Sequence, residues 1–137
     1  MMTLLIGLFL WIAAHFFKRV LPSMRQGMND RLGAGPARGI MSVLILGSVV
    51  LMVIGYRSAP TDQLYSPMAG MGHLNNLLMV GAVIMMGMGS SKGRLRSLLR
   101  HPMLSGVIVW AIAHLIVNGD MASVVLFGGM IVWSVLQ

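Results

Sequence analysis

The chain has 137 residues, of which 57% are hydrophobic and only 9% are Asp, Glu, Lys or Arg. Soluble domains of this size carry about 25% charged residues, so the composition excludes a water-covered globular domain. It predicts an all-α integral membrane protein in a lipid bilayer. The net charge of +7 would suit a nucleic-acid partner, but the basic residues lie between long apolar runs, so none is expected. The absence of cysteine excludes disulfides, thiolate metal sites and covalently attached haem.

Apolar segments follow one another along the chain and predict a bundle of about five transmembrane helices. The segments are 2–17, 39–56, 74–89, 102–117 and 121–136. Each is slightly shorter than the about 20 residues that cross a bilayer, and snorkelling Lys and Arg side chains would absorb the mismatch. Residues 26–39 are expected to form a polar, Gly-rich connection, and residues 57–72 a small lid on the outer side.

Basic residues are confined almost entirely to alternate connections. The first group is Lys18, Arg19, Arg25, Arg31 and Arg38, and the second is Lys92, Arg94, Arg96 and Arg100. The positive-inside rule therefore predicts an N-terminus outside and a C-terminus inside. No positive charge precedes the first apolar segment, which argues against a cleaved signal peptide.

The four histidines are the candidate ligands, because no Asp or Glu lies inside a predicted span. Two facing imidazoles are the usual way to hold b-type haem in a helical bundle. His15 and His114 lie within apolar runs, where a hydrogen bond between helices is the alternative explanation. His73 and His101 begin their segments and could equally be interfacial residues. Depth leaves three pairings open: His15 with His101, His73 with His114, or His15 with His114 if the first helix runs on to Met24 or tilts.

Two other features lie near these histidines. Trp110 precedes His114 by one turn and would either flank a cofactor or pack in the core. A basic row, consisting of Arg94, Arg96 and Arg100, would contact haem propionates or anionic lipid. A catalytic triad and a complete phosphate loop are both missing, so the chain carries no hydrolase or transferase signature.

The stretch 100–128, RHPMLSGVIVWAIAHLIVNGDMASVVLFG, resembles the signature region of the NnrU family of membrane proteins. Further matches occur in order: His15 with Arg25, Arg31-Leu32-Gly33 with Gly35-Pro36 and Gly39, Gly55-Tyr56, and His73-Leu74. The family is named for its link to nitrogen-oxide respiration and includes the plant and cyanobacterial 15-cis-zeta-carotene isomerase. The resemblance implies that residues 1–137 form one NnrU-like transmembrane domain, short at the C-terminus relative to the family, in a bacterial inner (cytoplasmic) membrane.

The resemblance also implies a cofactor. The isomerase branch is understood to bind haem b through a histidine of the first span and the Ala-His of the signature region. These positions correspond to His15 and His114. Further candidate cofactor contacts are His101, Trp110 and Arg100, and alternative metal ligands are His101 and His73.

Two classes of function follow. The first is a redox-linked haem protein, in nitrogen-oxide respiration (denitrification) or with isomerase-like activity, and the sequence leaves open whether it is an enzyme. The second is a small structural subunit of a larger membrane complex or homo-oligomer. In that case the 17 glycines and 15 methionines would serve helix packing.

Overall fold

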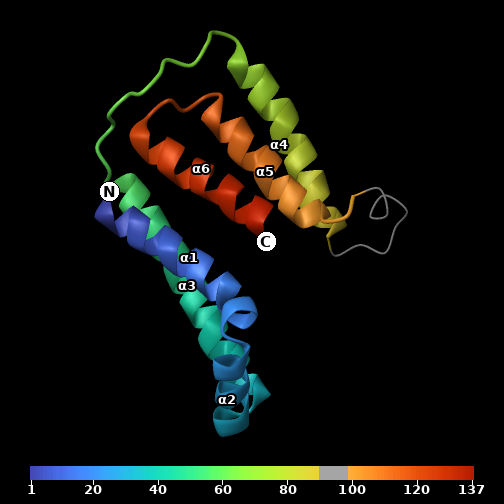
Figure 1. Cartoon of the computed structure of the whole chain (residues 1–137). Coiled ribbons are helices and arrows are strands. Elements are labelled where there is room, and N and C mark those ends of the chain that lie inside the picture. The colour runs from blue at the N-terminus through green and yellow to red at the C-terminus, as the bar shows by residue number, and fades with distance from the viewer. Residues whose placement is uncertain (90–98) are drawn as a thin grey trace. The chain divides into compact units, whose positions relative to one another are not determined.

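The computed structural model describes residues 1–89 and 99–137, which form six helices in two compact units, Met1–Ala59 and Pro60–Gln137. The helices are α1 (Met2–Val20), α2 (Pro22–Leu32), α3 (Ala34–Arg57), α4 (Met71–Met88), α5 (Pro102–Leu115) and α6 (Met121–Leu136). Figure 1 shows the helices of each unit. The all-helical fold class predicted from the sequence is confirmed for the described residues.

Three described helices, α1, α3 and α4, are long and apolar enough to cross a membrane. Two shorter apolar helices, α5 and α6, have 14 and 16 residues. At about 1.5 Å per residue, they would span about 21 and 24 Å of a hydrocarbon core about 30 Å thick. A membrane environment therefore fits the helices, while the count of five spans and the orientation stay predictions.

In the first unit, α1 packs antiparallel to α3 through very small residues. A Cβ on Gly55 would collide with the backbone of Leu4, and a Cβ on Gly7 would lie only 2.7 Å from the Met52 nitrogen. Leu4 and Ser48 are completely buried at this contact. Small residues allow helix backbones to approach closely, which is how helices associate in lipid.

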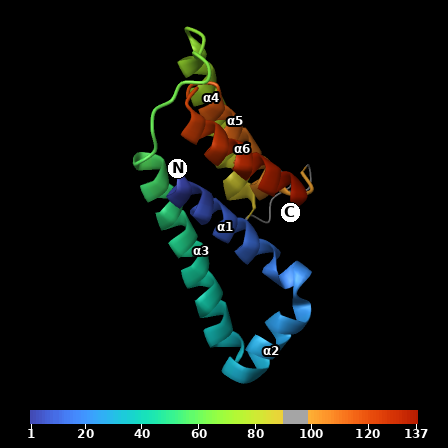
Figure 2. The ribbon, with the colours of Figure 1, turned by 60° about the vertical axis from the view of Figure 1, so that its left-hand side comes forward.

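The largest departure from the predicted segments is α2, which replaces much of the expected polar connection over 26–39. Pro22 occupies the start of this helix, where its missing N–H costs nothing. Gly33 ends it with φ of 84°, a conformation that glycine adopts readily. Figure 2 shows α2 at the end of the unit where α1 and α3 diverge.

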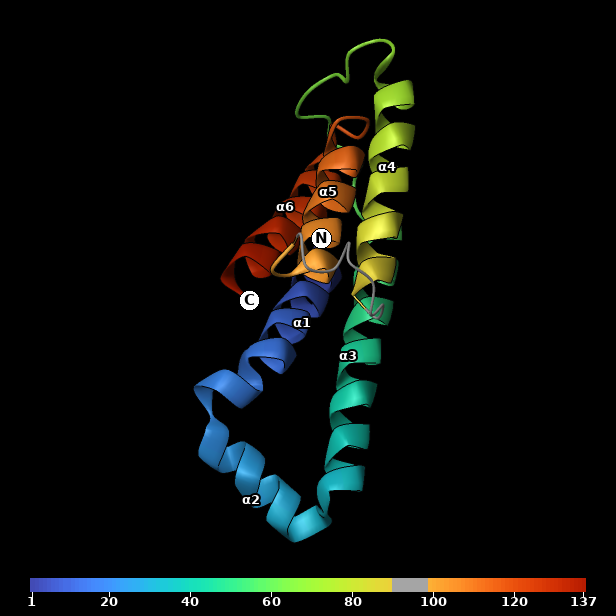
Figure 3. The same ribbon diagram turned by 90° about the vertical axis from the view of Figure 1, so that its right-hand side faces the viewer.

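In the second unit, α5 lies between α4 and α6, as Figure 3 shows. The α4–α5 contact again depends on small residues, because a Cβ on Gly106 would lie 2.9 Å from the Ala82 carbonyl oxygen. Ala82 itself is completely buried. On the other side of α5, the buried residues of α6 include Ala122, Phe127 and Trp133.

The connection before α4 is bound to the turn between α5 and α6. The amides of Leu64 and Tyr65 donate to the Gly119 carbonyl at 2.7 and 3.2 Å, and the Met121 amide donates to the Asp62 carbonyl at 2.9 Å. A side chain at Gly119 would collide with the Tyr65 backbone. The predicted lid segment is thus a strap across the end of α5 that follows His114.

Candidate functional site

His114 lies in the last turn of α5 and is half-buried. Its Nδ1 is 2.9 Å from the carbonyl oxygen of Trp110, one turn earlier. The ring of Trp110 is tilted against the imidazole with centroids 5.0 Å apart, and Phe127 of α6 stacks on it at 4.5 Å. The histidine is therefore held by its own helix and by an aromatic residue of the neighbouring one.

His15 has the same local arrangement in the first unit. Its Nδ1 lies 2.8 Å from the carbonyl oxygen of Trp11, and the two rings are 4.3 Å apart. The residue before the histidine is alanine in both helices, and both Ala14 and Ala113 are buried. The motif Trp-x-x-Ala-His thus occurs twice in the chain, with the same contact between the imidazole Nδ1 and the tryptophan carbonyl.

This geometry determines the tautomer of both imidazoles. A backbone carbonyl only accepts hydrogen bonds, so the Nδ1 atoms of His15 and His114 carry the protons and donate. In the neutral ring, Nε2 then keeps the lone pair that a metal requires. Histidines that bind metals usually donate their second N–H to a carbonyl or carboxylate in this way. Both residues are suited to axial ligation of haem iron.

Two polar side chains hold the end of α5 beyond His114. The side-chain amide of Asn118 donates to the His114 carbonyl oxygen at 3.0 Å. The Tyr65 hydroxyl bonds the carbonyls of Leu115 and Asn118, the second at 2.8 Å. The His114 carbonyl also accepts the backbone amides of Val117 and Asn118 at 3.2 and 2.9 Å. Leu115 is the last residue of α5, where helix carbonyls lack partners within the helix. Tyr65 and Asn118 therefore stabilise the turn that carries the histidine.

The other predicted site residues lie elsewhere. Arg100 and His101 are exposed and line a pocket of about 170 Å³ at the start of α5. Thirteen residues separate His101 from His114, which is about 20 Å along the helix. His73 is exposed near the start of α4. The predicted basic residues Lys92, Arg94 and Arg96 lie outside the described residues. Of the predicted contacts that fall within the described residues, only Trp110 lies beside His114.

Other kinds of metal site have less support. In the part of the chain that the structure describes, no three His, Cys, Asp or Glu side chains come together. A mononuclear zinc or iron site usually needs three or four such ligands. The described residues therefore offer no such three-ligand site. Haem needs only one or two axial ligands from the protein.

Sequence reasoning missed three residues that the structure places against or near the two histidines. Trp11 could have been found, because the repeated Trp-x-x-Ala-His motif is visible in the sequence. Phe127 and Tyr65 had no such signal. Each reaches α5 from a different segment, α6 in one case and the strap in the other.

A comparison with known protein families matches residues 3–137 to the family model described as NnrU protein. No curated protein and no solved structure matches the chain. The match includes both histidine motifs and, apart from Met2, all of the six described helices. It covers essentially the whole chain, and the chain therefore belongs to the NnrU protein family.

Proposed function

We propose that this protein binds haem b in the membrane through His15 and His114, and that its function is redox-linked. The observation that supports the proposal is the repeated Trp-x-x-Ala-His turn, in which the carbonyl of the tryptophan fixes Nδ1 as a donor. When bound, haem b supplies a one-electron iron couple and a polarising metal centre. The protein's residues would hold the imidazoles in the correct tautomer and exclude water.

The length of α1 supports this pairing. The sequence predicts a span ending at residue 17, whereas α1 continues past Lys18 and Arg19 to Val20. His15 is thus five residues, about 7.5 Å, from the end of its helix. Snorkelling of the two basic side chains would allow His15 to lie deeper than the apolar segment alone indicates.

The alternative pairings have less support. His73 and His101 are exposed, and the described residues include no hydrogen-bond partner for either ring. Among the described residues, no hydrogen bond fixes the tautomer of either imidazole. His15 and His114 are both partly buried and both oriented by a carbonyl and a tryptophan ring.

The membrane topology belongs to the same proposal. We infer five spans with the N-terminus outside, in a bacterial inner membrane. The five apolar helices and the basic residues on alternate connections support this topology. The redox-linked role would serve nitrogen-oxide respiration or isomerase-like chemistry, as the family resemblance implies.

The experiment is a spectrum of the purified full-length protein after haem-replete expression. We expect a reduced-minus-oxidised spectrum of low-spin haem b in the wild type. The variants His15→Ala and His114→Ala should each lose haem or convert it to a high-spin form that added imidazole restores. The matched controls His73→Ala and His101→Ala should keep the wild-type bands.

Three results would overturn the assignment. Absence of haem bands in the wild type would end the cofactor proposal. Unaltered spectra in both His15→Ala and His114→Ala, or loss of the bands in His101→Ala with retention in His114→Ala, would refute the ligand pair.

A further inference from the structure

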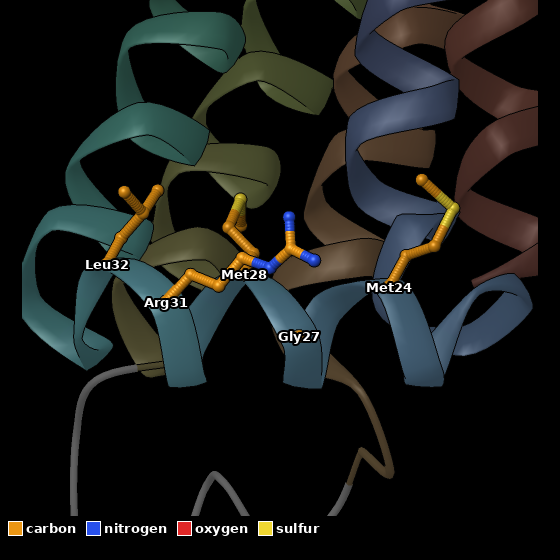
Figure 4. Close-up of a pocket in the computed structure, with 5 residues that line it drawn as sticks. All are labelled: Met24, Gly27, Met28, Arg31 and Leu32. Atoms are coloured by element: carbon orange, nitrogen blue, oxygen red, sulfur yellow. The ribbon is translucent and has the colours of Figure 1, made fainter.

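A pocket of about 470 Å³ lies on one face of α2, in the first unit. Its lining residues are Met24, Gly27, Met28, Arg31 and Leu32. Their spacing of three, four, seven and eight residues places them on one side of a helix. Figure 4 shows the side chains of Met24, Met28 and Leu32 extending to the same side, with the Arg31 guanidinium above Gly27. The pocket thus combines apolar walls with one cation.

The surroundings of this pocket are strongly basic. Residues 18–38 hold five basic side chains and one acidic one, a net charge of 5 − 1 = +4. Their single carboxylate, Asp30, does not line the pocket. An anion near this face would therefore meet an excess of positive charge.

Within the described residues, Arg31 differs from two neighbouring arginines, because its guanidinium has no hydrogen-bond or ion-pair partner there. Arg25 donates to the Ala37 carbonyl at 3.2 Å, and Arg38 donates to the Ala34 carbonyl at 3.1 Å. The structure gives the Arg31 guanidinium no hydrogen bond or ion pair to residues 1–89 or 99–137. A guanidinium has five N–H donors that match phosphate oxygens bidentately. Arg31 is thus available for an anionic group.

The position of α2 indicates where such an anion would come from. It joins α1 and α3, two helices that are long and apolar enough to cross a membrane. The joined ends carry Lys18 and Arg19 of α1 and Arg38 of α3. If α2 lies along the membrane interface, Met24, Met28 and Leu32 would reach the acyl chains and Arg31 the headgroups. A free phosphate would leave the methionine and leucine walls unused.

We propose that this face of α2 binds one acidic phospholipid, with the phosphate on Arg31 and the acyl chains against Met24, Met28 and Leu32. Net positive charge selects a headgroup without a compensating ammonium. Gly27 leaves the floor of the pocket open for the glycerol region, since a Cβ there would meet no atom within 4 Å. The lipid would anchor the basic end of the unit at the bilayer surface.

Native mass spectrometry of the full-length, delipidated protein tests this site. Phosphatidylglycerol and phosphatidylcholine are added separately, and the retained lipid is measured. Because one basic residue near a membrane surface contributes about 1 kcal/mol, Arg31→Gln should lower phosphatidylglycerol retention about fivefold. Gly27→Leu should lower it comparably by filling the pocket without changing the charge.

The matched control is Arg57→Gln, which removes the same charge from the exposed end of α3. It should leave retention nearly unchanged. Arg31→Lys keeps the charge and should retain part of the binding, so a fold defect in Arg31→Gln would not obscure the result. Circular dichroism checks that each variant is helical.

Several outcomes would overturn the proposal. Equal retention of the two lipids would show that the headgroup charge does not matter. An equal effect of Arg57→Gln would show that general charge, and not the α2 pocket, controls binding. Displacement of the lipid by millimolar inorganic phosphate would identify a free anion as the ligand.

Discussion

The ring of Phe127 stacks on the imidazole of His114, with centroids 4.5 Å apart and planes inclined by 27°. Phe127 also meets the edge of Trp110 at 5.1 Å and is only 4% exposed. This contact joins α5 to α6 at the candidate ligand. The orientation of the His114 ring therefore depends on a residue of α6, which lies outside the Trp-x-x-Ala-His motif.

Replacing Phe127 should lower the stability of the protein and change the orientation of the His114 ring. Phe127→Ala should lower the free energy of unfolding by about 3 kcal/mol, because it leaves a cavity between α5 and α6. Phe127→Leu should cost less and should alter the haem spectrum while retaining the haem. Thermal unfolding in detergent and the reduced-minus-oxidised spectrum measure the two effects. A wild-type melting temperature in Phe127→Ala would contradict the packing seen here.

The α1–α3 contact predicts that alanine substitutions at two glycines of α3 will have very different effects on stability. Gly55→Ala should destabilise the protein by about 1–3 kcal/mol, because the new methyl group would displace the α1 backbone at Leu4. Gly47 is the matched control, since a Cβ there meets nothing within 4 Å. Gly47→Ala should be neutral or slightly stabilising. Similar melting temperatures for the two variants would argue against this helix pair.

The Tyr65 hydroxyl is expected to contribute to the stability of the second unit. Tyr65→Phe removes its bonds to the carbonyls of Leu115 and Asn118 and should cost about 1 kcal/mol. It should also increase amide hydrogen exchange in the last turn of α5. The neighbouring, exposed Ser66 provides a control in Ser66→Ala. Unchanged exchange in Tyr65→Phe would mean that the strap does not hold this turn.

The carboxylate of Asp120, which caps α6, should make the stability of the protein depend on pH in the acid range. Burial raises the pKa of its carboxyl, but hydrogen bonds from the Ser123 hydroxyl and from the amides of Ser123, Asp120 and Ala122 together hold that pKa below its ordinary value. The ionised carboxylate caps α6, with the Ser123 amide 2.9 Å from Oδ1. A lowered folded-state pKa means that the stabilisation is complete above the ordinary carboxyl pKa of about 3.9. It is lost as the pH falls through the lower folded-state value.

The variant Asp120→Asn separates the charge from the cap. Asparagine still caps a helix, so the variant should unfold with a weaker acid dependence below about pH 4. Asp120→Ala should lose the cap as well and cost about 1 kcal/mol near neutral pH. Melting temperatures from pH 3 to 7 distinguish the two. Parallel pH profiles for wild type and Asp120→Asn would exclude this carboxylate as the titrating group.

Orientation in the membrane can be tested on a background without cysteine. Ser23→Cys in α2 should react with a membrane-impermeant maleimide only after the cells are permeabilised. Thr61→Cys in the strap should react in intact cells. Both side chains are exposed, so a difference in labelling reports the side of the membrane and not burial within the protein. The reverse pattern would place the N-terminus inside and refute the charge-based topology.

Hydropathy located the apolar helices well but not all of their ends. The segment 121–136 coincides with α6, because Asp120 caps the helix immediately before its apolar run. α1 and α3 extend beyond the predicted 2–17 and 39–56, since helical hydrogen bonding continues through basic residues that hydropathy excludes. α2 was missed because it has no apolar run. Its sequence signals were the four-residue spacing of Met24, Met28 and Leu32, with Pro22 at its start and Gly33 at its end.

The sequence by itself determined the helical class, the likeness to the NnrU family and the two histidines that lie in apolar surroundings. The hydrogen bond from each imidazole to a tryptophan carbonyl is also a local feature, because residues four apart are neighbours on any helix. Only the tertiary structure decided that Phe127 stacks on His114 and that Tyr65 holds the end of α5. Those contacts join segments distant in the chain, and their geometry depends on how closely the helices pack, which local periodicity does not specify.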